Sequence, residues 1–346
     1  MTVLVRSASL TKYSGIARAA GIDPVQMVSH VGLDRECLHT PDLRIPEFRL
    51  AEVLETSARI TACHSLGLLM GESWRLSDFG PVSLTLQHQP TLRDALAEVE
   101  RYRHLLSDSV ATQFTEHANI AVLRVTLLTG RQQPGRQAME LTVGAVLCLI
   151  RAILGAQWKP RCVHFSHAAP ADLRVHRRLF GQQVEFGCEF DGLVLSSQDL
   201  DRVNPLADAS LARYARELLD LQSPSKEHSP TADVRRAIHL LLPRGRSAVE
   251  QVAQNLGVSP RTLQRQLEQR GETFSGLVNQ VRRELAERYL QSQQQSISRT
   301  ADLLGFSEVS AFTRWFGVQF GKPPTRWVME GRGIVSQEDV NRPTGG

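Results

Sequence analysis

The sequence of 346 residues predicts two domains of different fold class: an α+β domain over residues 1–221 and an all-α domain over residues 232–330. Two observations lead to this division. Segments with the alternating apolar pattern of β-strands occur up to about residue 195 and do not recur after the polar stretch "LQSPSKEHSPTAD". Beyond that stretch, "NLGVSPRTLQRQL" at 255–267 is echoed by "LLGFSEVSAFTRWF" at 303–316. The echo indicates two copies of one helical unit.

The polar stretch separates two parts of different charge. Its two Ser-Pro pairs are typical of a linker, which we place at residues 222–231. Residues 231–330 hold 14 Lys and Arg against 9 Asp and Glu, whereas residues 1–230 hold 24 against 25. A basic domain beside a near-neutral one indicates a polyanionic partner for the basic domain. We expect the glycine-rich polar end, 331–346, to be a flexible tail.

The sequence predicts a cytoplasmic protein with no membrane partner. The longest apolar stretch, from Val143 to Ile150, ends at Arg151 and is far shorter than the roughly 20 residues that span a bilayer. The N-terminus "MTVLVRSASL" lacks the sustained apolar segment of a secretory signal. Scattered cysteines without a CxxC pair indicate reduced thiols; these are Cys37, Cys63, Cys148, Cys162 and Cys188.

In the α+β domain, apolar residues at i, i+3, i+4 spacing predict helices over 47–62, 91–106 and 137–154. Two β-rich runs in "SVATQFTEHANIAVLRVTLL" flank a polar tip at His117-Ala118-Asn119 and predict a hairpin. Further strands are expected at 161–166, 183–186 and 190–195.

The first copy of the repeat predicts two short helices joined by a tight turn. Ser247 and Glu250 form the capping-box pattern that begins a helix, and Gly257 stands where a helix end favours a left-handed residue. Ser259 is a good N-cap, and Pro260 suits the first turn of a second helix. An apolar stripe lines the first helix: Val249, Val252, Ala253 and Leu256. Together these form a helix-turn-helix, whose second helix can lie in the major groove of DNA.

The second copy repeats this arrangement 48 residues later. The matching positions are Ile297 for Val249, Ala301 for Ala253, Leu304 for Leu256, Gly305 for Gly257 and Ser307 for Ser259. One additional residue then enters, so that Phe312 takes the place of Leu263 at an offset of 49.

The period of the α-helix, about 3.6 residues per turn, determines which face of the second helix in each copy points outward. In the first copy, Leu263 and Leu267 point toward the core. The opposite face therefore carries Arg261 and Arg265, with Gln264 at its flank. Arginine can pair with guanine, glutamine can pair with adenine, and either can bind phosphate.

In the second copy, the core positions are Phe312 and Phe316. The opposite face carries Ser310 and Arg314, with Thr313 at its flank. Since this set differs from Arg/Gln/Arg, the two copies are expected to read different bases.

A long helix is expected to join the two motifs, because "FSGLVNQVRRELAERYLQ" has one continuous apolar stripe. Two second helices on the same face of B-DNA must lie about 34 Å apart, one helical turn. The alternative is a generic helical bundle with a coincidental repeat. Two matches in register and a local basic surplus argue against it.

Other chemistry is weakly represented. Cys162 and His164 would share one face of a strand, but His167 would not, and no further cluster with ligand spacing follows. We expect no metal and no cofactor. We interpret 176–178 ("HRR") as a solvated helix face, whose arginines could also hold an acidic effector. No GxSxG, phosphate-binding glycine loop or HExxH pattern is present, so the sequence does not predict an enzyme.

The all-α region resembles the AraC/XylS family of bacterial transcription regulators. The similarity rests on "VEQVAQNLGVSPRTLQRQLEQRGETF", on the joining helix, and on "SISRTADLLGFSEVSAFTRWFGVQFGKPPTRW". One departure is Gly317-Val318, where many relatives carry basic residues. The resemblance implies that promoter DNA is contacted at positions matching the outward faces: Arg261, Thr262, Gln264, Arg265, Ser310, Thr313 and Arg314.

The α+β region is similar to the sensing and dimerisation domain of the branch that contains ornithine-utilisation regulators, through Phe79-Gly80-Pro81 and "PTLRDALAEVERYRHLLSD". It does not resemble the cupin-type sugar-binding arm of the arabinose regulator, so an arabinose ligand is not inferred. The resemblance implies a homodimer, contact with RNA polymerase, activation of transcription and control by a small effector. The alternative is a constitutive or architectural DNA-binding protein without a ligand, against which the sizeable mixed domain argues.

Overall fold

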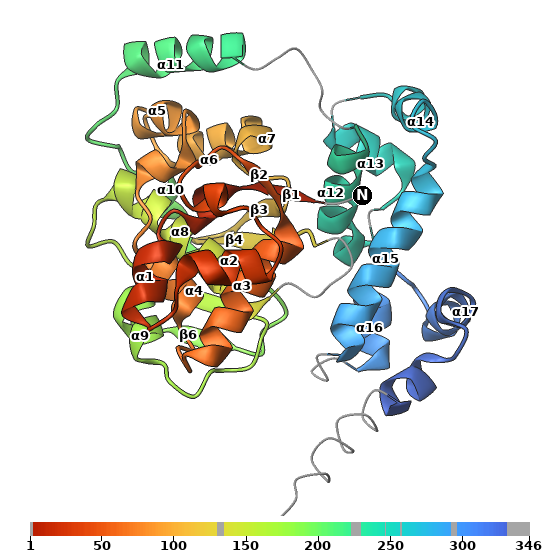
Figure 1. Cartoon of the computed structure of the whole chain (residues 1–346). Helices are drawn as coiled ribbons and strands as arrows, with labels where there is room; N and C mark the ends of the chain where they lie inside the picture. The colour runs from red at the N-terminus through yellow and green to blue at the C-terminus, as the bar shows by residue number, and fades with distance from the viewer. Residues whose placement is uncertain are drawn as a thin grey trace, which may run out of the picture. The chain divides into compact units, whose positions relative to one another are not determined.

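The computed structural model describes residues 3–129, 135–222, 230–245, 247–256, 258–291 and 296–330. The chain divides into two compact units, Met1–Glu227 and His228–Gly346 (Figure 1). Of the predicted linker, residues 223–229 lie outside the described residues. On either side of these residues the chain is helical: α11 ends at Gln222 and α12 begins at Pro230. Proline suits the first position of a helix, because its missing N–H would have no partner within the helix there. The predicted tail, 331–346, also lies outside the described residues.

The first unit contains a five-stranded mixed sheet with the order β3-β4-β7-β5-β6. All neighbours are antiparallel except β5 and β6. A separate two-stranded sheet pairs β1 with β2. The strands are β1 (Leu4–Arg6), β2 (Arg44–Pro46), β3 (Val110–His117), β4 (Ile120–Leu127), β5 (Cys162–Phe165), β6 (Val184–Phe186) and β7 (Asp191–Ser196).

The predicted hairpin is confirmed. His117 pairs with Ile120, which leaves Ala118 and Asn119 as a two-residue turn. Ala118 has φ of 50°, a value that short hairpin turns require. The alternating side chains of β4 place Ala121, Leu123, Val125 and Leu127 in the core.

Helices cover this sheet and pack on one another. They are α1 (Tyr13–Ala19), α2 (Pro24–His30), α3 (Glu47–Ile60), α4 (Leu66–Glu72), α5 (Val82–Gln87), α6 (Leu92–Arg101), α7 (Arg103–Leu106), α8 (Arg136–Leu154), α9 (Arg174–Phe180), α10 (Ser197–Leu200) and α11 (Ala209–Gln222). The helix predicted over 91–106 is divided at Tyr102, which is buried and donates a hydrogen bond to Asp220 of α11 at 2.8 Å. This tertiary contact overrides the local periodicity.

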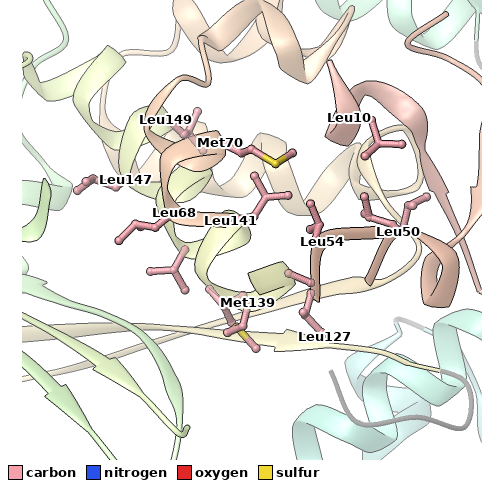
Figure 2. Close-up of a cluster of buried hydrophobic side chains, with 14 of the residues drawn as sticks. Leu10, Leu50, Leu54, Leu68, Met70, Leu127, Met139, Leu141, Leu147 and Leu149 are labelled. Carbon is pink, nitrogen blue, oxygen red and sulfur yellow. The ribbon is translucent and has the colours of Figure 1, made fainter. Parts of the chain in front are cut away.

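Helix α8 is the core helix of the first unit. Long and apolar enough to cross a membrane, it is mostly buried within the unit, so the core accounts for its composition. Glycines allow α4 to lie against it: a Cβ on Gly71 would stand 3.0 Å from the Cα of Gly144. Figure 2 shows the apolar side chains that fill the surrounding core, including Leu54, Met70 and Leu141.

The second unit is helical throughout its described secondary structure. Its helices are α12 (Pro230–Leu241), α13 (Val249–Asn255), α14 (Pro260–Glu268), α15 (Phe274–Gln291), α16 (Ile297–Leu303) and α17 (Val309–Phe320), followed by a helical turn over 324–330. They enclose a separate apolar core that includes Leu263, Leu267, Val281, Phe312 and Phe316.

Candidate DNA-binding surface

The first helix-turn-helix consists of α13 and α14, and α13 begins one residue later than the sequence predicted. Ala248 is the N-cap, with extended backbone angles, and its N–H donates to the Gln251 side-chain oxygen at 3.2 Å. The predicted capping box of Ser247 and Glu250 is therefore wrong. The extended conformation of Ala248 places Gln251, not Glu250, at the third helical position.

The two turns are held by equivalent backbone hydrogen bonds. The N–H of Val258 donates to the Ala253 carbonyl at 3.0 Å, and the N–H of Phe306 donates to the Ala301 carbonyl at the same distance. Gly305 has φ of 72°, as the sequence predicted for this helix end. A Cβ there would meet the Leu242 carbonyl oxygen at 3.1 Å, so the position also needs a small residue for packing. Gly257 lies outside the described residues.

The additional residue of the second copy lies in its turn. Ser259 caps α14: its hydroxyl accepts from the Thr262 N–H at 3.1 Å and lies 2.8 Å from the Thr262 hydroxyl. In the second copy the N-cap is Glu308, without a side-chain cap. The predicted match of Ser307 to Ser259 is therefore wrong for the N-cap position. The longer turn of the second copy places the N-cap of α17 one residue later, at Glu308.

The outward face of α14 is the predicted one. Leu263 and Leu267 are each 1 % exposed and anchor the helix in the core. Arg261, Gln264 and Arg265 are exposed. Burial of the two leucines thus fixes the orientation of the three polar side chains.

The outward face of α17 follows the same rule. Phe312 and Phe316 are buried, whereas Ser310 and Arg314 are exposed. Thr313 is half-buried, and its hydroxyl donates to the Val309 carbonyl at 2.9 Å.

Side-chain contacts join α17 and the turn before it to α15, which runs between the two motifs (Figure 1). The Trp315 indole N–H donates to the Asn279 side-chain oxygen at 3.0 Å. The Arg282 guanidinium donates to the Leu304 carbonyl at 3.1 Å and lies 4.4 Å from the centre of the Phe306 ring. These contacts hold the second turn and α17 on the joining helix.

The positive charges of this surface are not neutralised within the described chain. Among the described residues, none forms an ion pair with Arg261, Arg265 or Arg314. Val318, one turn after Arg314 on the same face of α17, is 81 % exposed. An uncharged side chain thus occupies a place where a cation could meet a polyanion.

The first unit encloses a polar cluster that sequence reasoning missed. Glu140 and His176 are fully buried, and their Oε1 and Nε2 atoms are 3.1 Å apart. His167 Nε2 lies 3.5 Å from the same carboxylate oxygen, and burial lowers the pKa of His167. The second oxygen of Glu140 is buried without a hydrogen-bond partner among the described residues. In the sequence, the feature that could have indicated this cluster is Glu140, an acidic residue within the apolar segment that forms α8.

The histidine in "HRR" was placed wrongly on a solvated face. His176 points into the core and contacts Glu140, while Arg178 is on the surface and pairs with Glu72. Packing against Phe165 and Phe186 explains the burial of the imidazole ring.

Comparison with known proteins identifies the family. Residues 21–204 match the family described as "Arabinose-binding domain of AraC transcription regulator, N-term". The chain belongs to the AraC family of transcription regulators. Residues 252–329 match a family described as "Helix-turn-helix domain". This AraC-family protein is thus a DNA-binding transcription regulator with an N-terminal ligand-binding domain.

The family description bears on one expectation. The N-terminal domain was predicted not to resemble the cupin-type sugar-binding arm of the arabinose regulator, and the matched family is described as arabinose-binding. The description names a ligand and not a cupin fold, so the expectation stays a prediction. Such a match identifies a domain family and does not transfer its ligand.

Similar proteins cover nearly the whole chain. The transcriptional regulator VirS of Mycobacterium tuberculosis is 28 % identical, over 91 % of this chain and 94 % of its own length. The ornithine utilization regulator of Pseudomonas aeruginosa is 24 % identical, over 90 % of each. The crystal structure of the regulator CdpR from Pseudomonas aeruginosa aligns with a TM-score of 0.38 at 21 % identity, covering 76 % of this chain and 86 % of that one.

Proposed function

We propose that α14 and α17 enter two adjacent major-groove segments of promoter DNA. The observation that carries the proposal is the pair of equivalent motifs, alike in anchors and turn bonds and different in outward side chains. Arg261, Gln264 and Arg265 would contact DNA from α14, and Ser310 and Arg314 from α17.

Their chemistry supports different roles. Arg265 and Arg314 are placed to form bidentate bonds with guanine or phosphate, and Gln264 with adenine. Thr262 and Thr313 already use their hydroxyls near the starts of their helices. We propose that these two contact the sugar-phosphate backbone, which positions each helix.

We infer that the protein forms a homodimer through α11. Four apolar side chains repeat on this helix with the 3-4-3 spacing of a two-helix seam, and all are about half exposed or more: Leu211, Tyr214, Leu218 and Leu221. The opposite face, including Ala215 and Leu219, is buried within the unit. A second copy of α11 is the partner whose stripe has the same spacing.

We propose that a small effector is recognised at the buried cluster of Glu140, His167 and His176. A buried carboxylate oxygen without a partner is costly in a core, and a ligand donor group would remove that cost. An effector with an ammonium, hydroxyl or amide group fits this requirement. We propose that effector binding there changes how the protein binds promoter DNA and RNA polymerase, and that transcription is activated as a result. This regulation would take place in the cytoplasm.

The two-helix proposal is tested by footprinting on duplexes selected from a random-sequence pool. We expect each subunit to protect two major-groove segments about 34 Å apart. Arg265→Ala should weaken protection of one segment and Arg314→Ala protection of the other. Loss of the same segment in both variants would contradict separate recognition.

A further inference from the structure

A second group of polar side chains lies on the sheet of the first unit, away from the Glu140 cluster. Cys162 and His164 alternate with the buried Val163 and Phe165 on β5 and so share its other face. Parallel pairing of β5 with β6 places Glu185 directly beside His164. Sequence spacing alone does not connect Glu185 with Cys162 and His164, because only the pairing of β6 with β5 brings it beside them.

The three side chains approach closely enough to share one ion. One ligand atom from each, the sulfur, an imidazole nitrogen and a carboxylate oxygen, lies within 4.8 Å of the others. Nε2 of His164 is 3.6 Å from a carboxylate oxygen of Glu185. In a tetrahedral zinc site the ligand atoms are about 3.5 Å apart, as bond lengths of roughly 2.0–2.3 Å require. Small rotations would therefore complete the site, and Glu185, on the edge strand, is exposed and able to rotate.

The surroundings of His164 favour a ligand role for its ring. The Phe190 ring packs against it with 4.7 Å between centres, which limits its rotation. On the other flank of β5, strand β7 places Gly192 beside His164, and glycine has no side chain that could occupy the space next to the imidazole ring. A Cβ on Gly192 would stand 2.1 Å from the Leu123 carbonyl oxygen, so the absence of a side chain is fixed by the backbone. His164 Nδ1 is buried without a hydrogen-bond partner among the described residues.

We propose that Cys162, His164 and Glu185 bind a zinc-class divalent ion, with three protein ligands and one open position. Thiolate and imidazole ligands together select Zn²⁺ over the hard ions Mg²⁺ and Ca²⁺, which take oxygen ligands. A bound ion would replace the thiol proton and would fix the three-residue edge strand β6 to β5.

The test uses the reduced full-length chain, freed of metal by a chelator and titrated with Co²⁺. We expect one equivalent to produce a thiolate-to-cobalt charge-transfer absorption that excess Zn²⁺ abolishes. Since loss of even an outer-shell partner costs about 10–100-fold in affinity, Cys162→Ser and His164→Ala should weaken binding by at least about tenfold. Glu185→Gln should weaken it in the same direction.

Cys188→Ser supplies the matched control, because this neighbouring thiol is not one of the three ligands. We expect it to keep the one-equivalent absorption, and the circular dichroism spectrum of every variant to match the wild type. Absence of the absorption from the wild type would overturn the proposal. The proposal would also be overturned if Cys188→Ser lost the absorption while Cys162→Ser retained it in full.

Discussion

Arg265 and Arg314 occupy equivalent places although 49 residues separate them in sequence. Each follows a buried apolar anchor by two residues, Leu263 in one helix and Phe312 in the other. Exposure alone would not identify them among the many arginines of this chain. Their position opposite a buried stripe on a helix that follows a tight turn distinguishes them.

Replacing Arg265 or Arg314 with alanine should weaken specific DNA binding by about 1–3 kcal/mol each, because the proposed bidentate contact would be lost. Competition binding with selected duplexes measures the change. Arg18→Ala, an exposed arginine on α1, is the control and should bind as the wild type does. Unchanged affinity in the double variant Arg265→Ala/Arg314→Ala would exclude the two-helix arrangement.

Glu47 should make the stability of the first unit depend on pH. The residue is 4 % exposed, and burial raises the pKa of its carboxyl to about 7, from an ordinary value of 4.5. Between these values the folded chain holds a proton that the unfolded chain releases, so stability falls as pH rises through this window. Relative to Glu47→Gln, the wild type should lose about 3 kcal/mol between pH 4 and pH 8.

Urea unfolding of the two proteins across this range measures the difference. A stability difference that does not vary with pH would show that the Glu47 carboxyl titrates normally. The glutamine variant controls for all other titrating groups, since it retains them.

At the scale of elements, α11 is unusual because one of its faces is buried in the unit while the opposite, exposed face is also apolar. Its inner face is fixed by Ala212, Ala215 and Leu219, and the Arg216 guanidinium pairs with Glu98 at 3.0 Å. The helix is therefore held firmly in the first unit while its outer stripe stays exposed. An exposed apolar stripe of this kind is typical of a subunit interface.

Leu218→Asp should convert the proposed dimer to a monomer, because it places a charge in the centre of the stripe. Sedimentation equilibrium of the full chain measures the mass. Ile60→Asp introduces the same charge at another exposed apolar residue, on α3, and should leave the mass unchanged. Equal association of wild type and Leu218→Asp would remove α11 from the interface.

Helix periodicity predicted the elements well where packing agrees with local preference. The apolar stripes of the repeat identified Leu263 and Phe312 as anchors, and alternation identified the hairpin. Local pattern failed where the deciding contact is distant. The break at Tyr102 depends on Asp220, and the clusters around Glu140 and His164 depend on strand pairing and helix packing that no short window contains.

For the whole molecule, affinity for DNA should fall steeply with salt. Each phosphate that is neutralised contributes a slope of about −0.9 in log K against log salt, because condensed counterions are released. Val318→Arg should make the slope steeper by about one, since it places a cation on the same face of α17 as Arg314. Binding measured from low to high salt tests both, and a flat dependence would argue against a polyanionic partner.

The joining helix α15 also has a consequence for the promoters themselves. Its 18 residues span about 27 Å, and the hydrogen bond from Trp315 to Asn279 joins α17 to it, so the proposed two-helix arrangement places the motifs at a set separation. One inserted base pair between the two half-sites would rotate one groove by about 34–36°. In the proposed complex a base substitution would cost one contact, whereas an insertion would displace every contact of one helix. Target sites are therefore expected to diverge in sequence during evolution while their internal spacing stays constant.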